Sequence, residues 1–212
     1  MDLIEKALAF VENFFEQDFS GHDYFHTLRV FKMATHIATK EQADLRIVQL
    51  AALLHDVDDR KLSPHTCANK ANARHFLANN HVDETTIERI CHIIGEISYA
   101  GQDSVTPDSL EGQCVQDSDR LDAIGAIGIA RAFAYGGSHN RFMHHPAIAP
   151  KTEMSKEEYH SSNSTTINHF YEKLFLLKDL MNTPTAKELA KARDRYMREY
   201  VAEFMSEWDG IV

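Results

Sequence analysis

Leu50-Ala51-Ala52-Leu53-Leu54-His55-Asp56 is the segment of this chain from which its fold can first be inferred. Its five apolar residues are typical of the interior of a buried helix, but the run ends in two titratable side chains. Burying a carboxylate beside a histidine is costly unless the pair has a strong partner. A divalent metal ion is a suitable partner, because neutral imidazole and carboxylate are both good ligands for it. The segment therefore predicts a helix that ends at a metal site.

Helical periodicity continues on both sides of this segment. The predicted helices cover residues 2–16, 20–39, 44–56, 66–79, 83–97, 112–134, 156–181 and 183–208. Their starts carry typical capping residues: Ser20 with Asp23 three residues later, Asp44, Asp83, and Thr183 before a proline. Clean period-two alternation of β-branched residues is absent. The expected fold class is therefore all-α, a multi-helix bundle.

The chain length is suited to one domain. It has 212 residues, 43% of them hydrophobic, which is enough for one well-packed core. We expect a single domain over 1–212, with a core that carries the metal site at about 20–135 and C-terminal helices at about 156–208 packed on it. Irregular stretches are expected at 57–65, 98–111 and 136–155. The last is long for a compact domain, and such loops are often functional.

Charge and composition restrict the classes of partner. The chain carries 22 basic and 32 acidic residues, a formal net charge of −10, and no basic run longer than a dipeptide. Binding to a nucleic acid polymer or an anionic membrane depends on clustered Lys and Arg. These counts favour a small molecule as the ligand, bound with local help from a metal or a few cations.

The N-terminus and the cysteines indicate the cellular compartment. Residues 1–6 lack the basic and apolar regions of a secretory signal, and the most apolar stretch, 123–135, is too short to span a bilayer. Cys67, Cys91 and Cys114 are isolated and show no CxxC spacing, so we expect reduced, buried thiols. The expected location is cytoplasmic.

The geometry of the pair restricts where a shared ion can lie. Adjacent residues on a helix point about 100° apart, so His55 and Asp56 can share one ion where the helix ends, as it would at Val57-Asp58-Asp59. His26 upstream and Asp119 downstream come from separate predicted helices. A set of two histidines and two aspartates without thiolate suits Mn, Fe, Co, Ni or Zn better than Ca. Such an ion makes water nucleophilic near neutral pH and polarises a phosphoryl oxygen.

The order H…HD…D resembles the HD superfamily of metal-dependent phosphohydrolases. The matching text is GHDYFHTLRV at 21–30, LLHDVDD at 53–59 and VQDSDRLDAIGA at 115–126. The resemblance is closest to small, stand-alone bacterial HD-domain proteins described as predicted hydrolases, and it extends over nearly the whole chain. A lone HD dipeptide is weak evidence, whereas the four-part pattern in this order is specific.

The resemblance implies His26, His55, Asp56 and Asp119 as ligands of a divalent metal ion, which could be Mn, Fe, Co, Ni, Zn or Mg. The last ligand is placed at Asp119, because Asp-Arg-Leu is its usual context in the family. Dinuclear members carry extra histidines, and related stand-alone proteins often read His-Ser-Phe where this chain has Ile97-Ser98-Tyr99. We therefore expect one ion.

The resemblance also suggests roles for residues around the ion. Asp56 and Asp59 are the candidate catalytic carboxylates; Asp59 stands four residues after His55, where several relatives carry a carboxylate that assists proton transfer, although Asp58-Asp59-Arg60-Lys61 could also be a simple polar turn. The candidate substrate-binding residues are His22, Arg29, Lys61, His92 and Arg120.

Some residues are explained more simply by structure than by chemistry. Arg29, three residues after His26, could pair within its helix. The histidines at 139, 144 and 145 lie in a Gly/Pro-rich setting that favours a solvated loop. Gly125 and Gly128 follow no predicted strand, so we expect them to permit close helix packing rather than to bind phosphate.

The predicted function is a metal-dependent phosphohydrolase that acts on a small phosphorylated molecule such as a nucleotide. Two alternatives stay open. One is an HD-fold iron oxygenase, which would need more histidine ligands than the sequence shows. The other is a non-catalytic nucleotide-binding regulator with a structural metal.

Overall fold

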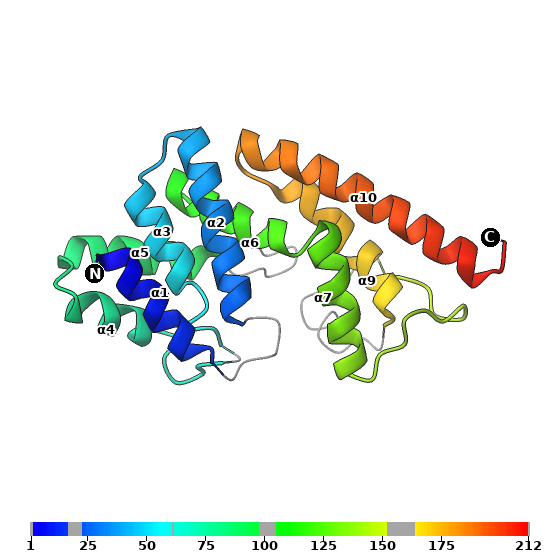
Figure 1. Cartoon of the computed structure of the whole chain (residues 1–212), viewed down its shortest axis with the longest axis horizontal. Coiled ribbons are helices and arrows are strands. Elements are labelled where there is room, and N and C mark those ends of the chain that lie inside the picture. The colour runs from blue at the N-terminus through cyan, green and yellow to red at the C-terminus, as the bar shows by residue number, and fades with distance from the viewer. Residues whose placement is uncertain (1, 17–22, 61, 98–104, 152–163, 212) are drawn as a thin grey trace. The chain divides into compact units, whose positions relative to one another are not determined.

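The structure, a computed structural model, describes residues 2–16, 23–60, 62–97, 105–151 and 164–211. Within these ranges every regular element is a helix, which confirms the all-α prediction (Figure 1). None of the described helices combines the length and the apolar character that crossing a membrane requires.

Contacts divide the chain into two compact units. Unit 1 comprises Met1–Tyr99 and Ser104–Asp119, and unit 2 comprises Ala100–Asp103 and Arg120–Val212. The single-domain description stays a prediction.

Unit 1 is built around the helix that contains the apolar run 50–54. Its helices are α1 (Leu3–Phe14), α2 (Tyr24–Glu41), α3 (Leu45–Leu54), α4 (Ala71–Asn79), α5 (Glu84–Ile97) and most of α6 (Leu110–Asp122). α3 packs against α1, α2 and α5, and Figure 1 shows α2 and α3 side by side. Residues 50–54 are completely buried, because every face of this part of α3 is covered.

Aspartates cap the starts of four of these helices, including Asp2 at the start of α1. Asp44 accepts hydrogen bonds from the backbone N–H groups of Arg46 and Ile47 at the start of α3, and Asp83 caps α5 in the same way. At the start of α2 the capping residue is Asp23, whose Oδ1 accepts from the N–H of His26 at 2.7 Å. The predicted partner of this cap, Ser20, lies outside the described residues.

Unit 2 packs two helices along the C-terminal one. Its elements are α7 (Gly125–Ser138), α9 (Thr166–Glu172), the 3₁₀ helix η2 (Leu174–Leu180) and α10 (Pro184–Trp208). α10 packs on α7 and η2, and α9 packs on α7 and η2. Phe133, Phe170, Tyr200 and Phe204 form an aromatic cluster in this core, with ring centroids 5.9 to 6.3 Å apart.

The prediction of one helix over 112–134 is wrong. α6 ends at Asp122, and α7 begins at Gly125. Ile124 is extended, and Gly125 has φ +78°, a conformation that L side chains rarely adopt. Gly125 therefore does more than permit helix packing, because it allows the chain to break and turn between α6 and α7.

Two further helix predictions need correction. Where one helix was expected over 156–181, α9 and η2 are separate, because the chain breaks at Lys173; residues 152–163 lie outside the described part. The helix expected from 66 begins instead at Ala71, after Lys70 in a left-handed conformation. The stretch expected to be irregular from 136 is helical through Ser138.

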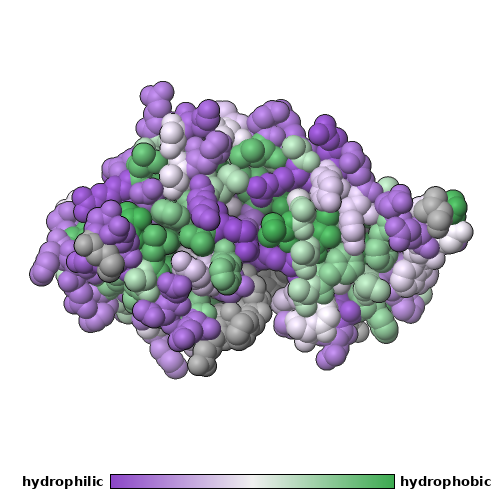
Figure 2. Space-filling model, in the orientation of Figure 1, coloured by the Kyte–Doolittle hydropathy of each residue, from purple (hydrophilic) through white to green (hydrophobic). Residues whose placement is uncertain are grey.

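Hydrophobic residues reach the surface on the face drawn in Figure 2, between hydrophilic ones. The most exposed large apolar side chains include Phe25 in unit 1 and Phe142 and Met143 in unit 2. Scattered exposure of this kind is normal for a folded domain.

His169 on α9 predicts how unit 2 responds to acid. Burial, followed by the charges of Lys173 and Arg141, lowers the pKa of this imidazole from 6.5 to about 3. Because the folded pKa lies below the unfolded value, the unfolded chain binds more protons between these limits. The stability that depends on neutral His169 is complete above pH 6.5 and declines as the pH falls toward 3.

We expect urea unfolding at pH 7, 6 and 5 to show a free energy of unfolding that falls by roughly 1 kcal/mol per pH unit from this group. His169→Gln, which cannot be protonated, should show a shallower decline. An equal slope for the variant and the wild type would contradict the assignment.

Candidate metal centre

His55 and Asp56, called the HD pair from here on, lie where α3 ends. α3 stops at Leu54, His55 follows as its C-cap, and Asp56 lies in the turn that comes next. The N–H of Asp59 donates to the carbonyl of Asp56 at 3.0 Å and closes this turn. His55 is 7% exposed and Asp56 is 8% exposed. The helix therefore ends slightly earlier than predicted, and both side chains can face one point.

Packing of α2 on α3 brings His26 to this pair. His26 lies in the first turn of α2 and is completely buried. Its Nε2 lies 3.4 Å from Oδ2 of Asp56, and Nε2 of His55 lies 3.3 Å from the same oxygen. One ligand atom from each of the three residues lies within 4.8 Å of the other two.

Asp119 reaches the same place from α6. Its Oδ1 lies 3.5 Å from Nε2 of His26. Two other aspartates lie near Asp119 in the chain. Asp117 is buried, and Asp122 pairs with Arg131 at 2.7 Å within unit 2. The structure thus groups His26, His55 and Asp56 in unit 1. The fourth predicted ligand, Asp119, lies next to His26 but outside the group whose ligand atoms are all within 4.8 Å of one another.

The residues fit a divalent ion by geometry and by chemistry. Two atoms that are each about 2.1 Å from one ion lie roughly 3.0–3.4 Å apart when they subtend 90–110° at it. The observed separations are 3.3, 3.4 and 3.5 Å. Nδ1 of His55 lies 2.8 Å from the Ala52 carbonyl, which can only accept. Nδ1 therefore carries the proton, and Nε2 can present its lone pair to a cation.

The electrostatics of His55 agree with a site for positive charge. Burial disfavours the protonated imidazole, but the carboxylates of Asp56 and Asp119 outweigh this effect and raise the pKa from 6.5 to about 9. The carboxylates thus favour a cation at Nε2, which is a proton when no metal ion competes for the same atom.

The other predicted site residues have diverse surroundings. Asp59 is half-buried in the turn after the pair, and Arg29 is half-buried on α2, one turn after His26. Arg120 is buried in unit 2, where its Nη1 donates to the Leu180 carbonyl. His92 is exposed on α5. His22 and Lys61 lie outside the described residues. These roles stay predictions.

Asp58 is a residue whose structural role the sequence did not reveal. It is 1% exposed, and its carboxylate accepts from the N–H groups of Asn72 and Ala73 at 3.1 and 3.0 Å. These groups lie in the first turn of α4, where backbone donors lack partners within the helix. Asp58 therefore connects the turn after the HD pair to α4.

Replacing Asp58 with alanine should leave these two donors unsatisfied. We expect the free energy of unfolding, measured by urea denaturation, to fall by about 2–3 kcal/mol. The matched control is Asp179→Ala, because Asp179 is 76% exposed and 4.0 Å from Lys178; it should change stability by less than about 0.5 kcal/mol. Equal effects of the two substitutions would show that Asp58 does not anchor α4.

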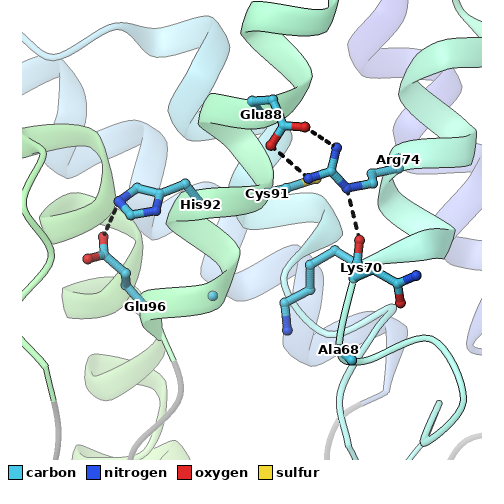
Figure 3. Close-up of a pocket in the computed structure, with 9 residues that line it drawn as sticks. Ala68, Lys70, Arg74, Glu88, Cys91, His92 and Glu96 are labelled. Carbon is cyan, nitrogen blue, oxygen red and sulfur yellow. Dashed lines mark hydrogen bonds and ion pairs between the residues drawn. The ribbon is translucent and has the colours of Figure 1, made fainter.

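A second group of ligating side chains comprises His92, Glu96 and Asp108. Only His92 is predicted from the sequence as a site residue. The spacing of His92 and Glu96 by four residues on a helix was a usable signal. Asp108 carries no such signal, because the packing of a later turn brings it there. Figure 3 shows His92 and Glu96 at the edge of a cleft.

Comparisons with known proteins agree with the geometry of the metal centre. The HD domain family matches residues 23–124, which contain all four predicted ligands. The protein YpgQ of Bacillus subtilis is 36% identical over 209 residues, which cover 98% of this chain and 94% of YpgQ. A crystal structure of YpgQ in complex with ADP has a TM-score of 0.78 and 34% identity, with 99% of this chain and 100% of that one covered.

Two further crystal structures are similar over almost their full lengths. An HD-superfamily hydrolase from Bacillus thuringiensis is 43% identical, with 97% of this chain and 96% of that one covered and a TM-score of 0.79. A protein from Lactobacillus plantarum is 41% identical, with 98% and 97% covered and a TM-score of 0.82. These similarities confirm the resemblance seen in the sequence, and the chain belongs to the HD domain family.

Proposed function

We propose that this chain is a metal-dependent phosphohydrolase that uses one divalent ion at His26, His55, Asp56 and Asp119. The observation that carries the proposal is that Nε2 of His26 and Nε2 of His55 lie 3.4 and 3.3 Å from one oxygen of Asp56. Asp119, from α6, adds a second carboxylate 3.5 Å from Nε2 of His26. When bound, a divalent ion supplies an activated water and polarises a phosphoryl oxygen. Membership of a family that includes an HD-superfamily hydrolase supports this chemistry.

The substrate class we propose is a small phosphorylated molecule, with nucleotides first. YpgQ crystallises with ADP, and the chains of the two proteins align over nearly their whole lengths. The net charge of −10 would repel a phosphorylated polymer. A single phosphoryl group needs only local positive charge, and Arg29, one turn after His26 on α2, is the described cation that we propose for this contact.

The protein groups at the site have distinct roles in this proposal. The Ala52 carbonyl fixes the ring of His55 through Nδ1 and so aims Nε2 into the site. Asp56, which lies between the two imidazoles, would neutralise part of the positive charge of the bound ion. Asp59, held in the turn by its bond to the Asp56 carbonyl, is the carboxyl group that we propose to protonate the leaving oxygen.

A phosphate-release screen tests the proposal. Purified protein is chelated, reloaded in turn with Mn, Co, Ni, Zn or Mg, and assayed on a panel of nucleotides and sugar phosphates. We expect release on at least one substrate that depends on added metal. Tight nucleotide binding with no release under any metal would favour the non-catalytic regulator. Oxygen uptake after anaerobic loading with iron would favour the oxygenase.

A further inference from the structure

A second cluster of ligating side chains lies on unit 1, outside the metal centre. His92 and Glu96 are one turn apart on α5, and Asp108 comes from the turn that precedes α6. Nε2 of His92 lies 3.0 Å from Oδ2 of Asp108 and 3.6 Å from Oε2 of Glu96. One ligand atom from each residue lies within 4.8 Å of the other two. The cluster thus has the same dimensions as the candidate metal centre at His26, His55 and Asp56, called the primary centre from here on. It lies on an accessible surface.

The backbone that carries these ligands is held in place by α6. Nε2 of Gln116 donates to the carbonyls of Glu96 and Val105, both at 2.8 Å. Nε2 of Gln113 donates to the Pro107 carbonyl at 3.0 Å. These bonds connect the end of α5 to the turn with Asp108. The position of the third ligand therefore does not depend on its contact with His92 alone.

Glu96 is the residue that a simple ion pair does not explain. Its side chain is only 15% exposed, and its Oε2 is buried without a hydrogen bond in the described part of the chain. A proton on Nε2 of His92 would account for the 3.0 Å contact with Asp108. At 3.6 Å, however, the same N–H leaves the Glu96 oxygen short of a hydrogen bond. A buried carboxylate oxygen without a donor is costly unless it has another partner.

A divalent cation would satisfy all three side chains. Separations of 3.0 and 3.6 Å from Nε2 lie close to the roughly 3.0–3.4 Å expected for atoms that share an ion. One neutral imidazole with two carboxylates gives a charge of −2, which a dication balances. One nitrogen and two oxygen ligands suit Zn, Mn or Co. Water can complete the coordination, because His92 and Asp108 have 57% and 69% exposed side chains.

The cleft beside the cluster gives an ion access from solvent. It has a volume of about 410 Å³, and His92 and Glu96 lie on one side of it, with Lys70 and Arg74 on the other (Figure 3). The guanidinium of Arg74 is bound by both oxygens of Glu88, at 2.6 and 2.8 Å. Its charge is therefore largely neutralised and opposes an approaching cation only weakly.

We propose that His92, Glu96 and Asp108 form a second binding site for a divalent transition-metal ion, which cross-links α5 to the turn before α6. This site takes no part in the proposed hydrolysis, and its existence does not depend on that function.

Metal stoichiometry tests the proposal on the whole chain. Chelated protein is titrated with Zn²⁺, and bound ions are counted by native mass spectrometry and by calorimetry. We expect two ions for the wild type. His92→Gln and Asp108→Asn should each keep the primary ion and weaken the second equivalent at least tenfold. His26→Gln should lose the primary ion and keep the second.

His75→Gln is the matched control, because His75 is an exposed helical histidine whose ring nitrogen contacts the amide of Asn79. It should bind two ions like the wild type. If both His92→Gln and Asp108→Asn bind two Zn²⁺ ions with the affinity of the wild type, the proposal is overturned. It is also overturned if the wild type binds a single ion and His26→Gln abolishes that binding. Circular dichroism shows whether each variant is folded. If one substitution in the second site prevents folding, the other decides, since the two residues lie on separate elements.

Discussion

Replacing Asp56 with asparagine is expected to lower metal-dependent phosphate release by about 10³-fold or more. The substitution keeps the shape of the side chain but removes the charge that lies 3.4 Å from Nε2 of His26 and 3.3 Å from Nε2 of His55. Loss of several kcal/mol of charge stabilisation at a bound ion corresponds to at least this factor in rate. The measurement is phosphate release at saturating substrate, together with the metal content of the purified variant.

Asp179→Asn is the control for this experiment, because the same chemical change is made on a side chain that is 76% exposed. It should keep activity within about twofold of the wild type. Activity of Asp56→Asn within threefold of the wild type, at full metal occupancy, would remove the basis of the proposed hydrolysis. Loss of metal and activity together would agree with it.

Replacing Gly128 with alanine is expected to lower the free energy of unfolding by about 3 kcal/mol. A methyl group at this position would collide with the backbone carbonyl group of Ala123, because the methyl carbon would lie 2.5 Å from the carbonyl carbon. Backbone cannot rotate aside as the end of a long side chain can. The start of α7 must therefore shift, and this shift would disturb the break between α6 and α7. Urea denaturation measures the effect as a lower midpoint.

Gly137→Ala in the same helix is the matched control. Nothing lies within 4 Å of a methyl group built at this position, and its backbone φ is not in the left-handed region. Alanine there should stabilise the chain by about 0.5–1 kcal/mol, because it loses less conformational freedom on folding than glycine does. Equal destabilisation by both substitutions would mean that helix composition, rather than the contact with Ala123, controls the result.

Local patterns were sufficient to predict most of the helices. The caps at Asp44, Asp83 and Thr183 and the apolar run of α3 are short-range signals, because the groups involved lie within four residues of each other. The helix breaks at Ile124-Gly125 and at Lys173 were missed. At Ile124-Gly125, apolar residues continue through the break, so the hydrophobic pattern does not indicate where the chain turns.

The candidate metal centre was predictable for a different reason. Its four residues follow the pattern H…HD…D, so the pattern can be recognised without knowing the distances between these side chains in space. Their distances could not be obtained from the order, because His26 and Asp119 are brought to the HD pair by the packing of α2 and α6 in unit 1. The role of Asp58 depends on backbone groups of α4 that carry no sequence signal, and Asp108 is brought to His92 only by packing.

The sequence by itself determined the all-α class, the apolar helix that precedes His55 and Asp56, and the chemical types of the candidate ligands. Periodicity, capping and residue type are properties of a single stretch of chain, and they persist whatever that stretch packs against. Tertiary structure decided which carboxylate faces which imidazole, and it placed Asp108 against His92 across 16 residues of chain. Such contacts depend on the packing of whole helices, and small changes in that packing move a ligand atom by more than the tolerance of a metal site.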